Sequence, residues 1–218
     1  MEAQDIAPLT NAARQSEPRN SRRTSSCLGS SAGRDILESE RLFREACPPA
    51  RHAPMIHLTS APWQKSFDEL RESLGGGFLC AMVGNRGTGK TQLGVELIRH
   101  SCLASRPALY CKALEIFMAI RATYDDKGKD EAAALRRFIA PALLVIDEAH
   151  ERGESAWEDR LLSYLLDKRY DCVRDTILIS NRTQDEFVKA IGPSVASRMQ
   201  ESGGIILCDW PSFRGMQG

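Results

Sequence analysis

The amino-acid sequence predicts an α/β fold in which a five-stranded parallel sheet is sandwiched by helices. Five apolar runs of strand length alternate with segments of helical periodicity, and the runs are apolar at successive positions, as in strands buried on both faces. This alternation is typical of parallel strands joined by helices. The predicted strands cover residues 78–84, 108–113, 142–147, 176–181 and 204–209, and the predicted helices cover residues 90–103, 113–124, 155–168 and 184–201.

The residues before this alternation have a different composition. Residues 1–35 are rich in Ser, Arg, Ala, Asn and Gly and show neither a helical nor a strand period, so we expect them to be mostly irregular. A short helix, "DILESERLFREA", and the Pro-broken connector "CPPARHAPMIHLTSAPW" follow. We therefore expect residues 1–60 to form a largely irregular N-terminal region with a Pro-rich connector, and residues 61–218 to form one folded domain.

The composition restricts the possible classes of function. The 29 basic and 29 acidic residues cancel, so binding to nucleic acid would require a local patch of charge. The seven cysteines include no CxxC pair, which favours reduced, intracellular thiols. The sequence starts without the pattern of a signal peptide, and its apolar runs are too short to span a membrane. We therefore expect a soluble, cytoplasmic protein that does not bind membranes.

The segment "AMVGNRGTGKTQL", at residues 81–93, spells Gly-x-x-x-x-Gly-Lys-Thr from Gly84 to Thr91. It lies between a predicted strand and a predicted helix, the context typical of a P-loop whose backbone N–H groups cradle phosphates. We expect Lys90 to reach the β- and γ-phosphates of ATP and Thr91 to supply a hydroxyl to Mg²⁺. A glycine-rich turn that binds nothing is the alternative. The predicted cradle consists of Gly84, Asn85, Arg86, Gly87, Thr88, Gly89, Lys90, Thr91 and Gln92.

Asp147 and Glu148 end the apolar run in "PALLVIDEAH", a pattern typical of a Walker B element. A parallel strand would deliver Asp147 to the C-terminal edge of the sheet beside the P-loop, where it could hold Mg²⁺ through the ion's hydration shell. Glu148 would then be free to polarise water, as expected of a hydrolase rather than a nucleoside kinase. The alternative is that the two acids only cap a strand.

Asn181 ends the fourth apolar run, "DTILISN". In an additional-strand ATPase, this strand lies between the P-loop strand and the Walker B strand, so that a polar side chain at its tip meets the γ-phosphate and the attacking water. Asn181 is therefore a candidate sensor. An asparagine after a strand is otherwise a common turn former.

These motifs together resemble a known family. "GNRGTGKT", "LLVIDE", "TILISN" and "VASRMQESGGIILCDWPSFRG" are similar to the AAA+ ATPases of the DnaC-type helicase loaders and to their relatives, the IstB-type transposase helpers. The resemblance covers about residues 45–215, with supporting similarity in "PPARH", "FMAIRATYDD" and "LLDKRYD". It implies that residues 61–218 form an AAA+ domain of the P-loop NTPase fold, with Mg²⁺-dependent ATPase activity, ATP and Mg²⁺ as cofactors, and a role in DNA replication.

By this resemblance, Arg198 in "SVASRM" corresponds to the family's box VII arginine. In a ring or spiral of subunits, that arginine projects into the neighbour's site and stabilises charge on the transferring phosphoryl group. The family usually has a second arginine four positions earlier, where this chain has Ser194. The chain also stops at "SFRGMQG", so a C-terminal lid domain is not expected. An ordinary surface arginine is the alternative interpretation of Arg198.

Two further patterns are weaker. Cys47, His52 and His57, with Cys27 upstream, are residue types that bind zinc, but their spacing differs from the usual CxxC knuckle. We therefore expect a connector that packs on the domain. The letters "DEAH" at residues 147–150 copy a helicase motif whose companion motifs are missing, so we interpret them as a chance match, with His150 in a supporting or surface position.

A basic cluster lies between the second and third predicted strands and consists of Lys127, Lys129, Arg136 and Arg137. Initiator and loader ATPases carry single-stranded DNA contacts close to this position, so DNA binding is one interpretation. Acidic neighbours make a solvated surface loop the other interpretation, and the charge pattern alone does not decide between them.

Three classes of function remain. The first is a helicase loader, an ATP-hydrolysing protein that places a replicative hexameric helicase on single-stranded DNA. The second is an IstB-type transposition helper that binds duplex DNA and a transposase. The third, a P-loop kinase, is disfavoured by Glu148, Asn181 and Arg198. Transposition helpers usually have a longer helical N-terminal region, so the irregular one predicted here favours the loader.

Overall fold

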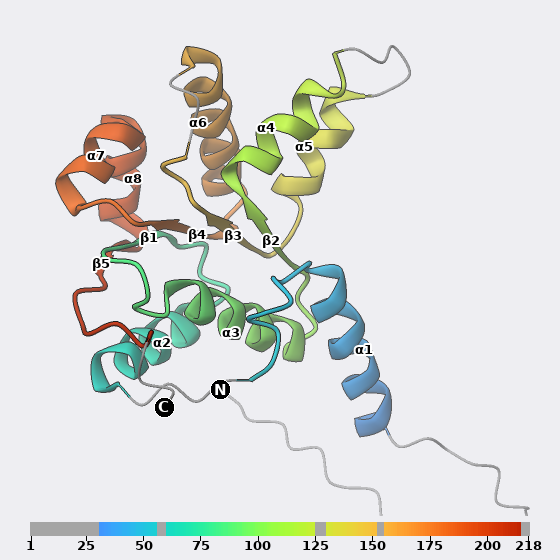
Figure 1. The fold of residues 1–218 in the computed structure, drawn as a ribbon. Coiled ribbons are helices and arrows are strands. Elements are labelled where there is room, and N and C mark those ends of the chain that lie inside the picture. Colours follow the sequence, from blue (N-terminus) through green and yellow to red (C-terminus); the bar gives the residue numbers. More distant parts are fainter. Residues whose placement is uncertain (1–30, 56–59, 125–129, 152–154, 215–218) are drawn as a thin grey trace, which may run out of the picture.

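The fold is built on a parallel sheet. A computed structural model describes residues 31–55, 60–124, 130–151 and 155–214 (Figure 1). In these ranges the strands form one five-stranded parallel sheet with the order β2-β3-β4-β1-β5, which confirms the predicted fold class. The strands are β1 (Leu79–Val83), β2 (Ala108–Lys112), β3 (Leu143–Asp147), β4 (Asp175–Ser180) and β5 (Gly204–Leu207).

Strand β4 lies between β1 and β3, as predicted for an additional-strand ATPase. The register pairs Val83 at the end of β1 with Ser180 at the end of β4, and Ile146 in β3 with Leu178 in β4. Because the strands are parallel, their C-terminal ends meet at one edge of the sheet. The sequence motifs that follow β1, β3 and β4 are therefore brought together.

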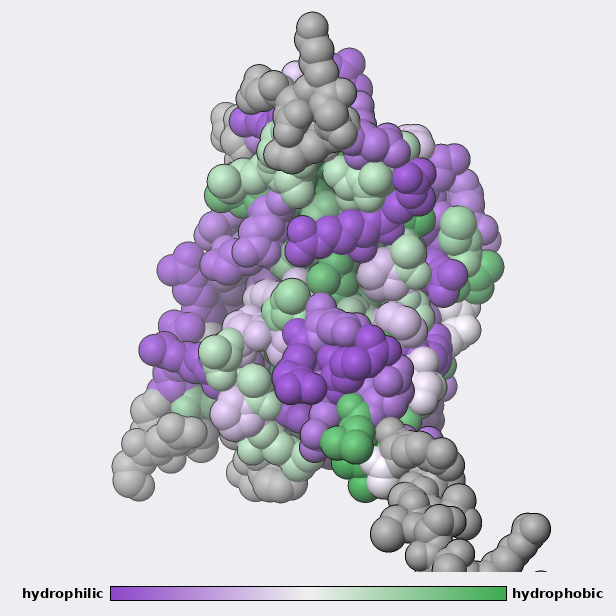
Figure 2. Space-filling view, turned by 90° about the vertical axis from the view of Figure 1, so that its right-hand side faces the viewer, coloured by the Kyte–Doolittle hydropathy of each residue, from purple (hydrophilic) through white to green (hydrophobic). Residues whose placement is uncertain are grey.

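Helices cover both faces of the sheet (Figure 1). The lower face in that view carries α1 (Ser31–Glu45), α2 (Ala61–Ser73) and α3 (Lys90–Leu103). The upper face carries α4 (Ala113–Arg121), α5 (Glu131–Ile139), α6 (Ala156–Asp171), α7 (Gln184–Ile191) and α8 (Pro193–Ser202). Alternate residues of each strand enter one of two apolar cores: Val145 packs toward α3, while its neighbours Leu144 and Ile146 pack toward the upper helices. Figure 2 shows the side of the molecule that lies on the right in Figure 1. On this side hydrophilic residues predominate and hydrophobic residues form small separate patches.

Two helices differ from the sequence prediction. The predicted helix at 184–201 is divided into α7 and α8 at Gly192, which has a φ of 87° and is followed by Pro193 at the start of α8. Proline has no N–H to continue a preceding helix but fits the first turn of a new one. The helix α5 was not predicted, and it includes Arg136 and Arg137, which we had placed in a basic loop.

The N-terminal region contributes a well-formed helix. The helix α1 begins at Ser31, earlier than the short helix predicted from the sequence, and it contacts α3 and β2. After it, the Ala46 carbonyl accepts a hydrogen bond of 2.8 Å from the backbone N–H of Tyr110 in the edge strand β2. This hydrogen bond gives a partner to one of the backbone N–H groups that an edge strand would otherwise leave unpaired.

Candidate nucleotide-binding site

The P-loop connects the end of β1 to the start of α3 and depends on glycine. Gly84, Gly87 and Gly89 have φ values of 135°, 88° and 79°, which side chains rarely adopt. A Cβ atom at Gly84 would also lie 2.5 Å from the carbonyl oxygen of Cys208. Glycine is therefore needed here for both conformation and space.

Three donors from distant segments of the chain hold carbonyl groups of the loop. The indole Nε1 of Trp210 donates to Thr88 O over 2.7 Å, that of Trp63 donates to Gly89 O over 3.2 Å, and the backbone N–H of Phe213 donates to Gly87 O over 2.9 Å. In a trans peptide the N–H points opposite to the C=O of the same unit. Fixing these carbonyls therefore fixes the direction of the next N–H groups, the donors that a phosphate needs.

Lys90 is almost fully buried at the start of α3. Its Nζ donates to the carbonyl oxygens of Gly84, at 2.7 Å, and Asn85, at 2.6 Å. Burial lowers the pKa of this ammonium group from its usual value. The charge is thus held beside the loop by neutral acceptors, and a phosphate would supply a stronger, anionic partner.

Thr91 and Asp147 meet as predicted. The Thr91 hydroxyl donates to Asp147 Oδ2 over 2.8 Å, and the backbone N–H of Glu148 donates to Asp147 Oδ1 over 2.7 Å. Tyr110 in β2 also donates its hydroxyl to Asp147 Oδ2, at 2.7 Å. A hydroxyl beside a carboxylate is the hard-oxygen donor set that Mg²⁺ prefers, so these residues fit the predicted ion.

Glu148 follows directly and has an unusual backbone. Its φ of 53° lies in the left-handed region, which is rare for a residue with a side chain. Its carboxylate is partly exposed, and Oε2 lies 2.8 Å from Nζ of Lys112 at the end of β2. The predicted water-polarising group is therefore at the expected edge of the sheet but is engaged by a cation.

Lys90, Thr91, Asp147 and Glu148 line one cavity of about 850 Å³, a volume within the range of ligand pockets. Its lining includes Asn181 from the end of β4, which places the candidate sensor with the P-loop and the Walker B pair. The remaining lining residues are Arg51, His52, Arg86, Gly87, Gly89, Lys90, Thr91, Gln92, Asp147, Glu148, Phe213 and Arg214. Of the predicted cradle, Gly84, Asn85 and Thr88 are not among the lining residues, and their carbonyl oxygens accept the hydrogen bonds from Lys90 and Trp210.

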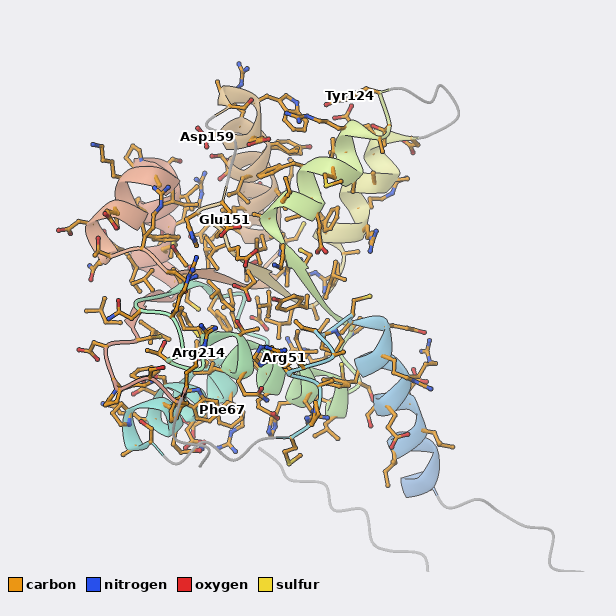
Figure 3. All side chains as sticks on the ribbon, viewed as in Figure 1. Arg51, Phe67, Tyr124, Glu151, Asp159 and Arg214 are labelled. Carbon is orange, nitrogen blue, oxygen red and sulfur yellow. The ribbon has the colours of Figure 1, made fainter. Side chains whose placement is uncertain are left out.

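Four of the lining residues were not predicted as site residues. Arg51 and His52 come from the connector motif "PPARH", which supported the family resemblance and in which His52 was considered only as a possible zinc ligand, and Phe213 and Arg214 follow β5. Figure 3 shows Arg51 and Arg214 on the same side of the sheet, near α3. The connector is held there by Gln92, whose Oε1 lies 3.0 Å from His52 Nδ1 and whose Nε2 donates to His52 O over 3.3 Å. The family resemblance of "PPARH" and "PSFRG" was a signal that could have marked these residues, but only the folded chain shows that they lie beside the P-loop.

Arg198 lies apart from this cavity. It is on α8, and its Nη1 lies 2.8 Å from Asp167 Oδ1 of α6 and donates to Ser194 Oγ over 2.8 Å. Its guanidinium carbon is also 5.8 Å from the centre of the Tyr170 ring. Ser194, which replaces the family's second arginine, therefore contacts the predicted finger in this chain.

The weaker motifs receive little support. Cys27 and His57 lie outside the described residues, Cys47 is exposed, and His52 contacts Gln92. The described part of the chain contains no cluster of three or more His, Cys, Asp or Glu that could hold a metal ion. His150 has a supporting contact, because its Nδ1 lies 3.2 Å from Ser180 Oγ, beside the candidate sensor.

The basic cluster is only partly described. Lys127 and Lys129 lie outside the described ranges. Arg136 pairs with Asp130 at 3.1 Å, and the Arg137 guanidinium lies over the Phe138 ring, so both cations already have contacts on the α5 side of the domain.

A sheet of this strand order, with a P-loop after β1 and paired acids after β3, defines an AAA+ type P-loop ATPase domain. Comparison with known proteins gives the family. Residues 79–199 match the model of the IstB-like ATP binding proteins, and the chain belongs to this family. ATP is therefore the nucleotide that the fold and the family indicate.

Curated proteins that the chain resembles include a replicative helicase loader. The chain is 28% identical over 132 residues to the replicative helicase loader DnaC of Escherichia coli strain K12, covering 60% of this chain and 54% of that protein. It is 26% identical over 135 residues to the uncharacterized protein YdaV of the same strain, covering 62% and 54%. The chain thus spans about half the length of the curated relatives that it matches.

Solved structures share the fold. The crystal structure of the DnaC helicase loader superposes with a TM-score of 0.63 at 19% identity, covering 72% of this chain and 98% of that one. AMPPCP-bound DnaA from Aquifex aeolicus superposes with a TM-score of 0.59 at 17% identity, covering 69% and 48%. Within the described ranges, every helix is too short or too polar to cross a lipid bilayer.

Proposed function

We propose that this protein hydrolyses ATP with Mg²⁺ and uses the reaction to place a replicative hexameric helicase on single-stranded DNA. The observation that carries the ATPase part is the convergence of Lys90, Thr91, Asp147, Glu148 and Asn181 on one cavity at the C-terminal edge of the sheet. The similarity to helicase loaders supports the role in replication. We also propose a cytoplasmic location, since the six cysteines in the described ranges are free.

Each side chain has a distinct role in this proposal. Lys90 would exchange the loop carbonyls for the β- and γ-phosphates, while the loop N–H groups bind the phosphate oxygens. Thr91 and Asp147 would hold Mg²⁺, which supplies charge neutralisation between the phosphates. Glu148 would orient and polarise the attacking water, and Asn181 would contact the γ-phosphate. For this, Glu148 must leave the ammonium group of Lys112.

The position of Arg198 supports self-association in a ring or spiral. Arg198 is not part of its own cavity lining and is held on the α6 side of the domain by Asp167. To complete a second subunit's site, the partly exposed Arg198 side chain would leave Asp167 and project outward from this surface. We therefore propose that hydrolysis is completed in trans by Arg198 of a neighbouring copy.

An aromatic cluster at the α4–α6 end supports binding of single-stranded DNA. The Tyr124 and Trp157 rings are 6.1 Å apart, and the Arg121 guanidinium lies 5.0 Å from the Trp157 ring centre. Tyr124 is 55% exposed, and it borders a second cavity of about 330 Å³ together with Trp157 and Tyr164. Exposed aromatic rings with adjacent arginines are surfaces on which unpaired bases stack.

The family match favours a second candidate, a transposition helper that binds duplex DNA and a transposase. Anisotropy of labelled single-stranded and duplex oligonucleotides of the same sequence separates the two. The binding is measured with ATP and the hydrolysis-defective Glu148→Gln variant. If the protein is a helicase loader, we expect it to bind the single-stranded oligonucleotide more tightly than the duplex. Tyr124→Ala should weaken that binding, whereas Met118→Ala, at an exposed position on α4, should not. A preference for duplex DNA would contradict the loader.

The partner is tested by affinity capture from host lysate with the Glu148→Gln protein and ATP, followed by mass spectrometry. A hexameric helicase that is retained with ATP and lost with Lys90→Ala supports the loader. A transposase retained in the same way supports the helper. Retention of neither protein would reject both proposed partners.

A further inference from the structure

Tyr110 is a buried residue to which neither the sequence motifs nor the family assigns a role. It lies in β2, where it is 8% exposed and packs in the core that faces α3. Lys112 pairs with Asp147 in the β2–β3 register, so Tyr110, two residues earlier, lies on the same face of the sheet as Lys112. From there its ring reaches along the sheet to Asp147.

The Tyr110 hydroxyl and the Thr91 hydroxyl donate to the same oxygen. Asp147 Oδ2 accepts from Tyr110 over 2.7 Å and from Thr91 over 2.8 Å, while Oδ1 accepts from the Glu148 N–H over 2.7 Å. A carboxylate held at both oxygens cannot rotate about its Cβ–Cγ bond without breaking hydrogen bonds. Two of its three donors belong to residues that must also serve the metal and the water, whereas Tyr110 serves neither.

The backbone of Tyr110 is also held in place by a hydrogen bond. Its N–H donates to the carbonyl of Ala46, which is fully buried directly after α1. A tyrosine phenol carries its proton at neutral pH, so the Tyr110 hydroxyl is available as a donor to Asp147. A buried phenol usually finds an acceptor, and here the acceptor is the predicted metal carboxylate.

We propose that Tyr110 is a positioning residue for the Mg²⁺ site: its hydroxyl orients Asp147 when the Thr91 oxygen turns to the metal. This inference rests on the proposed Mg²⁺-dependent ATPase function. Residues that orient a metal ligand typically change metal affinity by about 10- to 100-fold when they are removed. Tyr110→Phe removes only the hydroxyl and keeps the ring that packs in the core.

The test measures metal binding directly. Mn²⁺, as a probe for Mg²⁺, is titrated into ADP-saturated protein and the free ion is followed by electron paramagnetic resonance. We expect Tyr110→Phe to bind Mn²⁺ about tenfold more weakly than wild type, while its affinity for ADP in EDTA is unchanged. Ser73→Ala, which removes an exposed hydroxyl at the end of α2, is the control and should bind like wild type.

A second measurement guards against a change in stability. The rise in Tm that Mg²⁺ adds to ADP-bound protein is compared within each variant, so a lower starting Tm cancels. We expect a smaller rise for Tyr110→Phe than for wild type. Equal Mn²⁺ affinity and an equal Tm rise in wild type and Tyr110→Phe would overturn the proposed role of Tyr110 but would leave the proposed ATPase function standing. A wild-type protein without metal-dependent nucleotide binding would instead overturn the proposed function and this inference together.

Discussion

Lys112 and Glu148 form an ion pair with 2.8 Å between Nζ and Oε2. Lys112 ends β2, and Glu148 directly follows β3 with a left-handed backbone. The pair raises the pKa of Lys112, chiefly through the hydrogen bond from its ammonium group to the Glu148 carboxylate. The predicted water-polarising group is thus paired with a cation in this structure.

Replacing Lys112 should release Glu148. A partly exposed ion pair contributes about 0.2–1 kcal/mol, which corresponds to a factor of up to about five in the free population of Glu148. We therefore expect Lys112→Met to raise the basal rate of ATP hydrolysis by about two- to fivefold. Lys189→Met, at an exposed lysine of α7, should leave the rate unchanged. A lower rate in Lys112→Met would show that the lysine assists the reaction.

Arg198 should act in trans. Arg198→Ala is expected to bind ATP but to hydrolyse it about 10³-fold more slowly, because a charge that stabilises the transferring phosphoryl group is lost. Lys90→Ala keeps Arg198 but lacks the phosphate contact. Mixed together, the two inactive variants should recover part of the phosphate release. Continued inactivity of a mixture shown by light scattering to co-assemble would contradict the assignment.

Arg214 should bind nucleotide in cis. Arg214 lines the cavity, and its charge adds to burial in lowering the pKa of Lys90. A charged hydrogen bond contributes about 1.5–3 kcal/mol, so Arg214→Ala should weaken ATP binding by about 10- to 100-fold in an equilibrium titration. Addition of Lys90→Ala subunits should not restore it. Restoration would place Arg214 in a neighbour's site instead.

Arg169 should dominate the stability of the upper layer. It is fully buried in α6 and donates to the carbonyl oxygens of Phe138, Ile139 and Pro141, at 2.9–3.0 Å, as well as to β4. Arg169→Met would leave these carbonyls without donors, at a cost of about 3–5 kcal/mol in the free energy of unfolding. Urea denaturation gives that value directly. A loss as small as that of Arg136→Met, at a 66% exposed side chain, would contradict this role.

The sequence predicted those parts of the fold that depend on local pattern. The strand runs and the P-loop were located because apolar periodicity and glycine spacing are visible in short segments. Helix α5 was missed because its short segment "EAAALRRFI" follows a charged stretch, and the helix break at Gly192 was missed although the Gly-Pro pair marks it. Lys112 and Tyr110 were missed for another reason: their partners, Glu148 and Asp147, are 36 and 37 residues away in sequence and meet them only across the sheet.

The central claim is that the cavity at the edge of the sheet hydrolyses Mg·ATP. The most direct test is phosphate release from Mg·ATP, measured with ATP affinity, for wild type, Lys90→Ala and Glu148→Gln. We predict release by wild type, loss of both binding and release in Lys90→Ala, and retained binding without release in Glu148→Gln. Phosphate release by Glu148→Gln at the wild-type rate would contradict the account.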